Sequence, residues 1–168
     1  MTVIDWIKPM NKQLGFTLIE TMIIVAIIGV LAVLGSGFTV NWVRQAELNT
    51  ATTSLESAIN LTKSAAIRNA TGVVGDQTSG HLCLSNHTLI VHIGGDEDET
   101  GTESTCSTTS LYNFKISSNI IIKAASETDN FKCIAFNNSG QVVEAAGCTV
   151  NSPLTLVNAG GSETYAFK

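Results

Sequence analysis

The feature that most constrains this chain is an uncharged, largely apolar run from Thr21 to Val43, with Glu20 directly before it. As an α-helix the run would extend for about 34 Å, enough to cross the hydrocarbon core of a bilayer. A carboxylate at that depth costs about 2.5–3.5 kcal/mol on insertion scales, and no basic residue lies near Glu20 on the predicted helix. Since a simple anchor gains nothing from such a charge, we interpret Glu20 as a docking group. The alternative is a plain signal anchor with an incidental acidic residue.

The residues around Glu20 resemble a known processing signal. Leu14 to Glu20 read Leu-Gly-Phe-Thr-Leu-Ile-Glu, which resembles the class III signal of type IV pilins and type II secretion pseudopilins. The resemblance implies that a prepilin peptidase cuts after Gly15 and N-methylates the new terminus at Phe16. It also implies that Glu20 attracts the N-terminal ammonium of a neighbouring subunit as helices stack into a filament, where each charge offsets part of the other's desolvation.

Residues 1–15 would then be a cleaved leader rather than part of the fold. The first part of this leader is unusually apolar, whereas Met10 to Gly15 alone would make a short basic leader. We therefore hypothesise that translation starts at Met10. Lys8 and Lys12 precede the apolar run, which favours a cytoplasmic N-terminus, a single pass through the inner membrane and a periplasmic C-terminal domain.

The predicted helix continues beyond the apolar run. From Arg44 to Asn69 there is no Pro or Gly, and helix-favouring residues are frequent. Residues at helical spacing trace one narrow face, and charged residues occupy the opposite side; the first set is Leu48, Leu55, Ile59, Thr62 and Ala66, and the second is Glu47, Glu56, Lys63 and Arg68. Residues 16–43 would be the membrane and assembly half of one helix, and 44–70 an amphipathic half that packs on a sheet. Gly35 and Gly37 weaken the membrane half and mark where it could melt in a filament.

Residues 71–168 read as an extracytoplasmic β-rich domain. Eight short segments rich in β-branched and apolar residues predict strands, at His81–Leu84, Thr88–Ile93, Leu111–Ile116, Asn119–Ala124, Lys132–Phe136, Gln141–Glu144, Leu154–Val157 and Thr164–Phe167. Asn137 to Gly140 is typical of a hairpin turn. The domain also holds all four cysteines, which in an oxidising compartment predict two disulfides: Cys83, Cys106, Cys133 and Cys148.

Three further segments resemble the GspH/FimT group of minor pilins and pseudopilins. They are Ala46–Asn69, ending Lys-Ser-Ala-Ala-Ile-Arg-Asn, Leu82–Ser85, and Ile134–Gly140. The resemblance implies an α+β, pilin-like fold, in which a long N-terminal helix packs on two small antiparallel sheets. Four cysteines allow three connectivities, and our working hypothesis is sequential pairing, Cys83 with Cys106 and Cys133 with Cys148.

Charge and motif spacing argue against several other functions. Four lysines against ten acidic residues give residues 71–168 a net charge of −6, and no arginine follows Arg68, so a grip on nucleic acid is disfavoured. Consecutive acids, Asp96, Glu97, Asp98 and Glu99, suggest a calcium site, but they lack the spacing of an EF-hand and fit a solvated loop better. His81, Cys83, His87 and His92 suggest zinc, but an oxidised Cys83 supplies no thiolate. We expect no metal, cofactor, small-molecule substrate or enzymatic activity.

Three functions fit this sequence. The first is a FimU-like minor pilin that primes assembly of a type IV pilus, sits at its tip, and contacts other minor pilins and the major pilin through the N-terminal helices. The second is the equivalent minor pseudopilin of a type II secretion system. The third is a FimT-like DNA-uptake pilin, for which the tail Gly160–Lys168 lacks the expected arginines. An anchored periplasmic adaptor would fit only if Gly15 were not processed.

Overall fold

The structure, a computed structural model, describes residues 15–93, 105–124, 130–145, 147–149 and 153–166, except for the side chains of residues 36–38. It has an α+β fold in which, among these described residues, one long helix is followed by eight strands. The helix, α1, spans Leu18–Arg68. By its contacts the chain divides into two units, residues 1–40 and 41–168, so α1 contributes its first part to one unit and its second part to the other.

The strands form two antiparallel sheets, as the resemblance to pilins implies. Five strands lie in the order β3-β2-β1-β5-β6 and three in the order β4-β7-β8. The first sheet comprises β1 (Gly80–Ser85), β2 (Thr88–Ile93), β3 (Ser110–Lys115), β5 (Cys133–Phe136) and β6 (Val142–Val143). The second comprises β4 (Ile121–Lys123), β7 (Leu154–Asn158) and β8 (Gly161–Tyr165).

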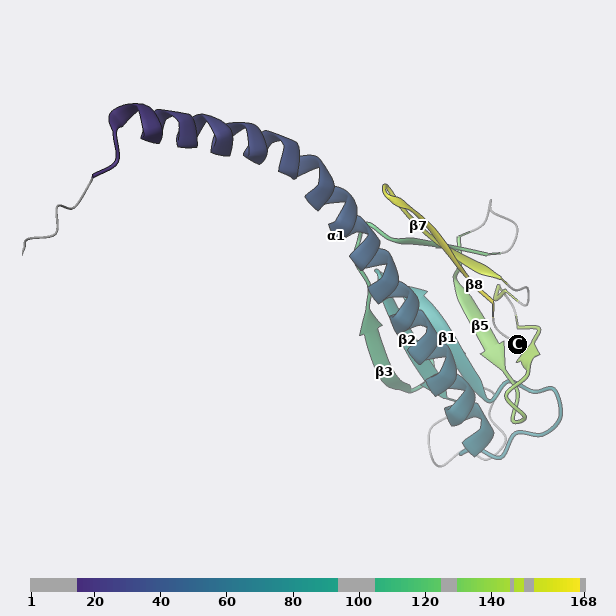
Figure 1. Cartoon of the computed structure of the whole chain (residues 1–168). Helices are drawn as coiled ribbons and strands as arrows, with labels where there is room; N and C mark the ends of the chain where they lie inside the picture. Colours follow the sequence, from purple (N-terminus) through teal and green to yellow (C-terminus); the bar gives the residue numbers. More distant parts are fainter. Residues whose placement is uncertain (1–14, 94–104, 125–129, 146, 150–152, 167–168) are drawn as a thin grey trace, which may run out of the picture. The chain divides into compact units, whose positions relative to one another are not determined.

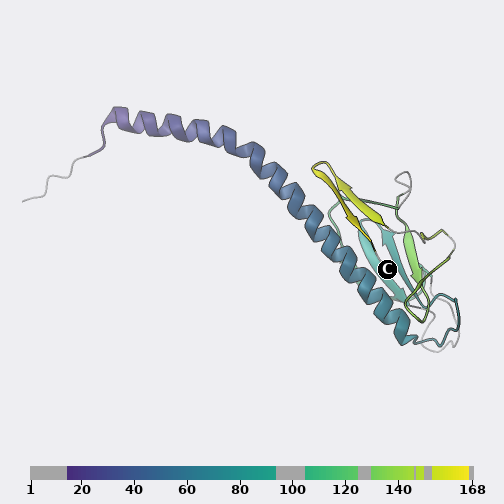
Figure 2. The same ribbon diagram turned by 45° about the vertical axis from the view of Figure 1, so that its right-hand side comes forward.

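The domain half of α1, residues 41–68, lies across one face of the five-stranded sheet, alongside β1, β2 and β3 (Figures 1 and 2). The predicted stripe on α1 is fully buried: Leu48, Leu55, Ile59, Thr62 and Ala66. It packs in one apolar core with residues that alternate along the strands, chiefly Leu82, Leu89, Val91, Ile134 and Phe136. The amphipathic pattern is therefore confirmed. Lys63 departs from it, because its ammonium lies 5.6 Å from the ring centre of Phe136 rather than pointing away from the sheet.

The end of α1 is formed by an asparagine. Asn69 has a φ of 45°, in the left-handed region that asparagine tolerates better than most residues, and its N–H bonds the carbonyls of Ala65 and Ala66. Its amide also donates to the carbonyl of Val73 at 2.8 Å. The helix therefore ends at Arg68, directly before this asparagine.

The predicted turn between β5 and β6 is confirmed. The N–H of Gly140 bonds the carbonyl of Asn137 at 2.9 Å, and Gly140 has the positive φ of 73° that such a turn needs. The Asn137 side chain accepts the N–H groups of Ser139 and Gln141. Both contacts hold the two strands in register.

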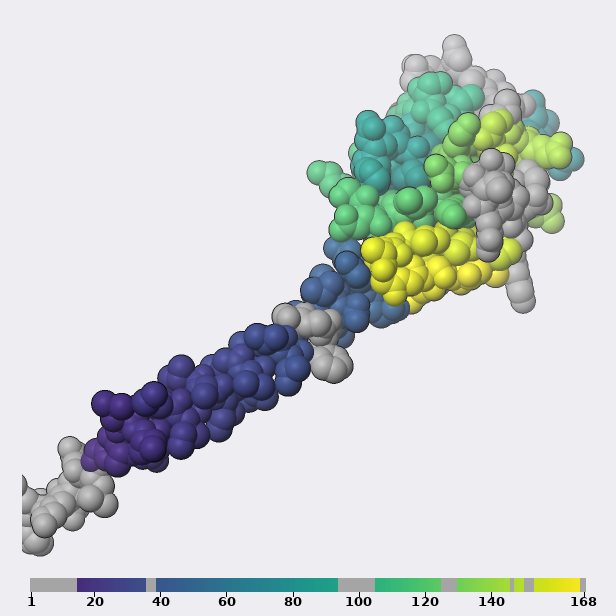
Figure 3. All heavy atoms as spheres, turned by 90° about the horizontal axis from the view of Figure 1, so that it is seen from above, coloured from purple at the N-terminus to yellow at the C-terminus, as the bar shows by residue number. Residues whose placement is uncertain are grey.

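The last strand differs from the prediction of Thr164–Phe167. β8 begins three residues earlier, at Gly161, which pairs with Asn158 of β7, while Phe167 lies outside the described residues. Ala159 and Gly160 form the tight hairpin turn between β7 and β8. That turn packs on the start of the domain half of α1 (Figure 3), where the Asn158 amide donates to the Arg44 carbonyl at 2.8 Å.

Candidate functional site

The predicted processing site lies in an exposed, non-helical segment. Residues 15–17 precede the first turn of α1, and the Phe16 side chain is 78% exposed. No neighbouring atom lies within 4 Å of the position that a side chain on Gly15 would occupy. Among the described residues, nothing packs against Gly15, and the Phe16 side chain is exposed.

Thr17 and Glu20 together begin the helix. The Glu20 N–H donates to Thr17 Oγ1 at 3.3 Å, which makes Thr17 the N-cap and Glu20 the third residue of the first turn. A carboxylate there also faces the positive end of the helix dipole. Thr17 was not predicted as a cap, although the Thr-x-x-Glu pattern of a capping box was present in the sequence. Capping therefore fixes Glu20 in the first turn of α1, four residues after Phe16.

An apolar surface follows Glu20 along the first unit. Large apolar side chains from Leu18 to Leu34 are exposed, from 44% at Ile24 to 77% at Leu18. Among the described residues, α1 is the one helix long and apolar enough to cross a membrane, and its most apolar stretch is entirely unburied. Exposure of this extent requires either lipid or other helices around it.

Comparison with known proteins agrees with this arrangement. Residues 10–39 match the prokaryotic N-terminal methylation motif. The match supports a type IV pilin or pseudopilin. Neither a curated protein nor a solved structure matches the chain. The motif covers residues 10–15 of the predicted leader, Phe16, Glu20 and most of the apolar run, and it implies processing by a prepilin peptidase and assembly between pilin subunits. Proteins with this motif are structural rather than enzymatic, and the membrane anchor with a C-terminal domain fits it.

The helix is continuous over the glycines that mark its predicted weak point. Gly35 and Gly37 both lie within α1, and Thr39 Oγ1 donates to the Gly35 carbonyl at 3.0 Å, a bond that competes mildly with helix geometry. Local melting in an assembled filament therefore stays a prediction for this segment.

Both disulfides lie on the sheet face that points away from α1. Cys83 is joined to Cys106 and Cys133 to Cys148, which is the sequential pairing, with Cα–Cα distances of 5.8 and 4.6 Å. Cys83 and Cys133 are direct partners in the register of β1 with β5. The bridges thus attach the segments around Cys106 and Cys148 to adjacent strands.

The metal sites considered from the sequence have no support where the structure can test them. In the described ranges, no three His, Cys, Asp or Glu side chains gather as metal ligands. His81 and His92 are buried and face each other across β1 and β2, while Cys83 is in a disulfide. Burial, with a smaller effect of His92, lowers the pKa of His81 to about 4. The acidic run Asp96–Glu99 lies outside the described residues.

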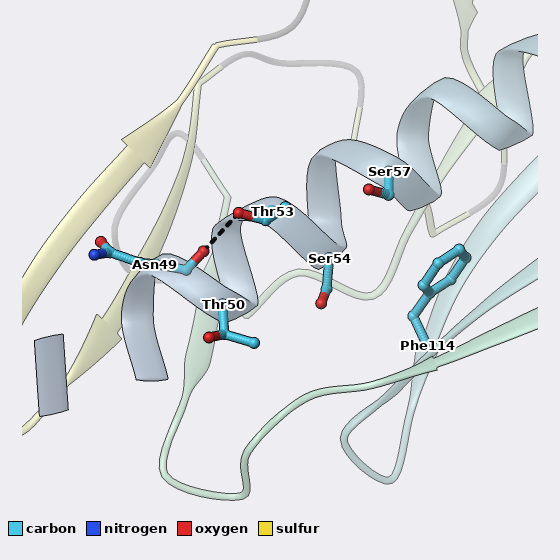
Figure 4. Close-up of a pocket in the computed structure, with 6 residues that line it drawn as sticks. All are labelled: Asn49, Thr50, Thr53, Ser54, Ser57 and Phe114. Atoms are coloured by element: carbon cyan, nitrogen blue, oxygen red, sulfur yellow. Dashed lines mark hydrogen bonds between the residues drawn. The ribbon is translucent and has the colours of Figure 1, made fainter. Parts of the chain in front are cut away.

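A shallow polar hollow lies between α1 and β3. It is lined by hydroxyl and amide side chains of α1 and by the Phe114 ring (Figure 4), and its volume is about 400 Å³. One of these hydroxyls, Thr53 Oγ1, donates to the Asn49 carbonyl at 2.9 Å. Such back-bonding satisfies this hydroxyl locally, and no charged side chain is found among the described residues that line the hollow.

Proposed function

We propose that this chain is a minor pilin that is cut between Gly15 and Phe16, methylated at Phe16, and built into the tip of a type IV pilus, where it primes assembly of the major pilin. The observation that supports this most is Glu20, capped into the first turn of a helix whose following side chains are apolar and exposed. A neighbouring subunit's N-terminal ammonium would offset the cost of the carboxylate, and the exposed apolar side chains would pack against neighbouring helices.

The mechanism that follows has two stages. Before assembly, the apolar half of α1 holds the subunit in the inner membrane, with the β domain on the periplasmic side. During assembly, the subunit leaves the bilayer when its helix docks against the helices of other minor pilins and the major pilin. Shape and charge of the β domain then determine which subunits can follow it.

The position at a tip rests on the resemblance of Ala46–Asn69, Leu82–Ser85 and Ile134–Gly140 to the GspH/FimT group. A type II secretion pseudopilin would use the same N-terminal chemistry, so the N-terminal residues do not distinguish the two assignments. They differ in what loss of the chain impairs, which is pilus formation in one case and protein export in the other. The acidic charge and the lack of arginine beyond Arg68 favour both over a DNA-uptake pilin.

The test is deletion of the gene, followed by shearing of surface pili and immunoblotting for the major pilin. The proposal predicts a large loss of pili that the intact gene restores. Unchanged pili together with a defect in protein export would assign the chain to a secretion system instead.

A further inference from the structure

The two disulfides lie next to each other on the five-stranded sheet, at one position of one strand pair. Cys83 of β1 and Cys133 of β5 are direct register partners. Each is joined to a cysteine outside the sheet, Cys83 to Cys106 and Cys133 to Cys148. The fold thus places a second possible partner, a cysteine of the other bridge, beside each of the two strand cysteines.

The hydrogen bonds around Cys83 and Cys133 show how closely the two residues approach. The Leu84 N–H donates to the Lys132 carbonyl at 2.7 Å, and the Cys133 carbonyl accepts the Thr149 N–H at 2.8 Å instead of bonding β1. Because bonded and non-bonded pairs alternate in an antiparallel ladder, Cys83 and Cys133 form a non-bonded pair, in which Cα atoms lie about 4.5 Å apart and side chains are closest. Disulfides span Cα distances of about 4.4–6.8 Å, so a bridge between these two cysteines fits the strands without moving them.

The four cysteines differ in their access to solvent. Cys83 and Cys133 are only 4% and 7% exposed, whereas Cys106 is exposed and Cys148 is half-buried. In thiol–disulfide exchange a thiolate attacks one sulfur of a bridge, and the other sulfur leaves as a thiolate. A thiol from solution therefore reaches Cys106 first, and the group that it releases is Cys83, directly beside Cys133.

We propose that the two bridges form one thiol–disulfide exchange site, at which a small-molecule thiol that attacks Cys106 converts the native pairing into a Cys83–Cys133 bridge. In the first step the thiolate bonds to Cys106 Sγ, and Cys83 Sγ leaves as a thiolate. In the second step Cys83 Sγ bonds to Cys133 Sγ, the bond between Cys133 and Cys148 breaks, and Cys148 takes up the proton that the incoming thiol lost. Two disulfides and one thiol are present before and after, so the exchange needs neither an oxidant nor a reductant.

The exchange would loosen two segments that cover this face and leave the sheet itself intact. Residues 105–109 would keep polar contacts such as that between His92 Nδ1 and the Thr108 carbonyl oxygen, which are 2.7 Å apart. Residues 147–149 would keep the bond from the Thr149 N–H to the Cys133 carbonyl. The strands β1 and β5 would gain a covalent link, and the buried His92 would become accessible. The inference does not depend on which filament the chain serves.

The variant Cys106→Ser tests the second step by itself. It has Cys83 as a free thiol beside the Cys133–Cys148 bridge, so the two pairings should interconvert without any added reagent. The full chain is kept in detergent at mildly alkaline pH, where a thiol is partly ionised, then quenched with acid, alkylated and mapped by peptide mass spectrometry. We expect linked Cys83–Cys133 peptides, and an alkylated Cys148 at no less than about a tenth of the level of alkylated Cys83, the equivalent of about 1.4 kcal/mol between the two pairings.

The matched control is Cys83→Ser, which also has one free thiol and the same Cys133–Cys148 bridge. Its free thiol is Cys106, which is not a register partner of Cys133, so Cys106 should be the one alkylated cysteine. A second measurement uses the unmodified chain with a limiting amount of glutathione, followed by the same quench and mapping. We expect Cys83–Cys133 peptides to appear there as well.

Three results would overturn the proposal. A folded Cys106→Ser variant in which Cys83 alone is alkylated would show that the neighbouring bridge does not exchange. Equal exchange in the Cys83→Ser control would show that motion of the segments, rather than the register of β1 and β5, brings the sulfur atoms together. If circular dichroism shows that Cys106→Ser does not fold, the unmodified chain decides, and glutathione on Cys106 with the Cys133–Cys148 bridge intact would refute the exchange.

Discussion

At the scale of single residues, close contact between α1 and β1 depends on a position without a side chain. A methyl group on Gly80 would lie 3.1 Å from Ala66 Cβ and 3.1 Å from the Thr62 carbonyl oxygen. Both neighbours belong to the buried face of α1, which cannot shift without disturbing the core. Glycine at this position therefore sets how near the first strand can approach the helix.

Gly80→Ala should lower the free energy of unfolding by about 1–3 kcal/mol, because overpacking at a fixed backbone must displace the helix or the strand. Urea unfolding followed by circular dichroism measures this. In the double variant with Ala66→Gly, which removes one of the two contacted groups, the loss of unfolding free energy should be smaller than the sum of the losses in the two single variants. Full additivity of the two changes would contradict the predicted contact.

His81 should make stability depend on pH. Burial lowers its pKa to about 4 in the folded protein, against 6.5 for the exposed side chain, so the unfolded chain binds the extra proton first as pH falls. The stabilisation is fully present above pH 6.5 and is lost progressively toward pH 4. We expect the domain to be about 1–2 kcal/mol less stable at pH 5 than at pH 7.5 on this account. His81→Gln should flatten that difference in melting experiments, and an equal pH dependence in the variant would show that other groups cause it.

Gly15 should be needed for maturation. Replacement of Gly15 by valine is expected to leave an unprocessed precursor in the membrane fraction, because a branched side chain would stand at the proposed cut site. Intact mass measurement distinguishes the precursor from the mature chain. A normal mature mass would place the cut elsewhere.

At the scale of elements, the long helix and the antiparallel strands were accessible from the sequence because their signals are local. Helical spacing identified the buried stripe from Leu48 to Ala66, and the Asn137–Gly140 turn carried its own chemistry. What the sequence did not reveal depends on the register of strand pairing, which a local pattern does not fix. The pairing of His81 with His92 requires the register of β1 and β2, and the start of β8 at Gly161 requires its pairing with Asn158.

The residues of the candidate site were predicted only in part. Gly15, Phe16 and Glu20 stood out because their motif is contiguous, whereas the cap from Thr17 was overlooked although its residues were equally close in sequence. The groove between Trp42 on α1 and Lys115 at the end of β3 could not be predicted from the sequence. These two residues are more than seventy positions apart, and Lys115 meets α1 only in the folded domain.

The two disulfides should contribute strongly to the β domain, which has few aromatic side chains. Replacing Cys133 and Cys148 together by serine is expected to lower the free energy of unfolding by about 2–5 kcal/mol, and the Cys83–Cys106 pair should behave alike. Melting with and without reductant gives a second measurement of the same quantity. An unchanged melting temperature under full reduction would refute this contribution.

At the scale of the whole molecule, the two units of the chain serve different surroundings. Residues 1–40 contain apolar side chains that are exposed in the isolated subunit, whereas residues 41–168 bury a core of their own. A pilin-like subunit needs both, because the first unit must leave lipid for a bundle of helices while the second stays folded. In the function that we propose, Glu20 would couple these states, since its charge is costly in the bilayer and stabilising beside a neighbour's N-terminus.

The most direct measurement is the amount of the chain in sheared filaments when Glu20 is replaced by alanine, compared at equal membrane levels with the unmodified chain. Glu56→Ala, which removes an exposed acid from the domain half of the same helix, is the control. The account predicts normal processing and folding of the Glu20 variant with at least about a tenfold loss from filaments, the equivalent of about 1.4 kcal/mol of docking free energy, and no loss for the control. Glu20→Ala filaments that contain the chain in unmodified amounts would contradict the central claim.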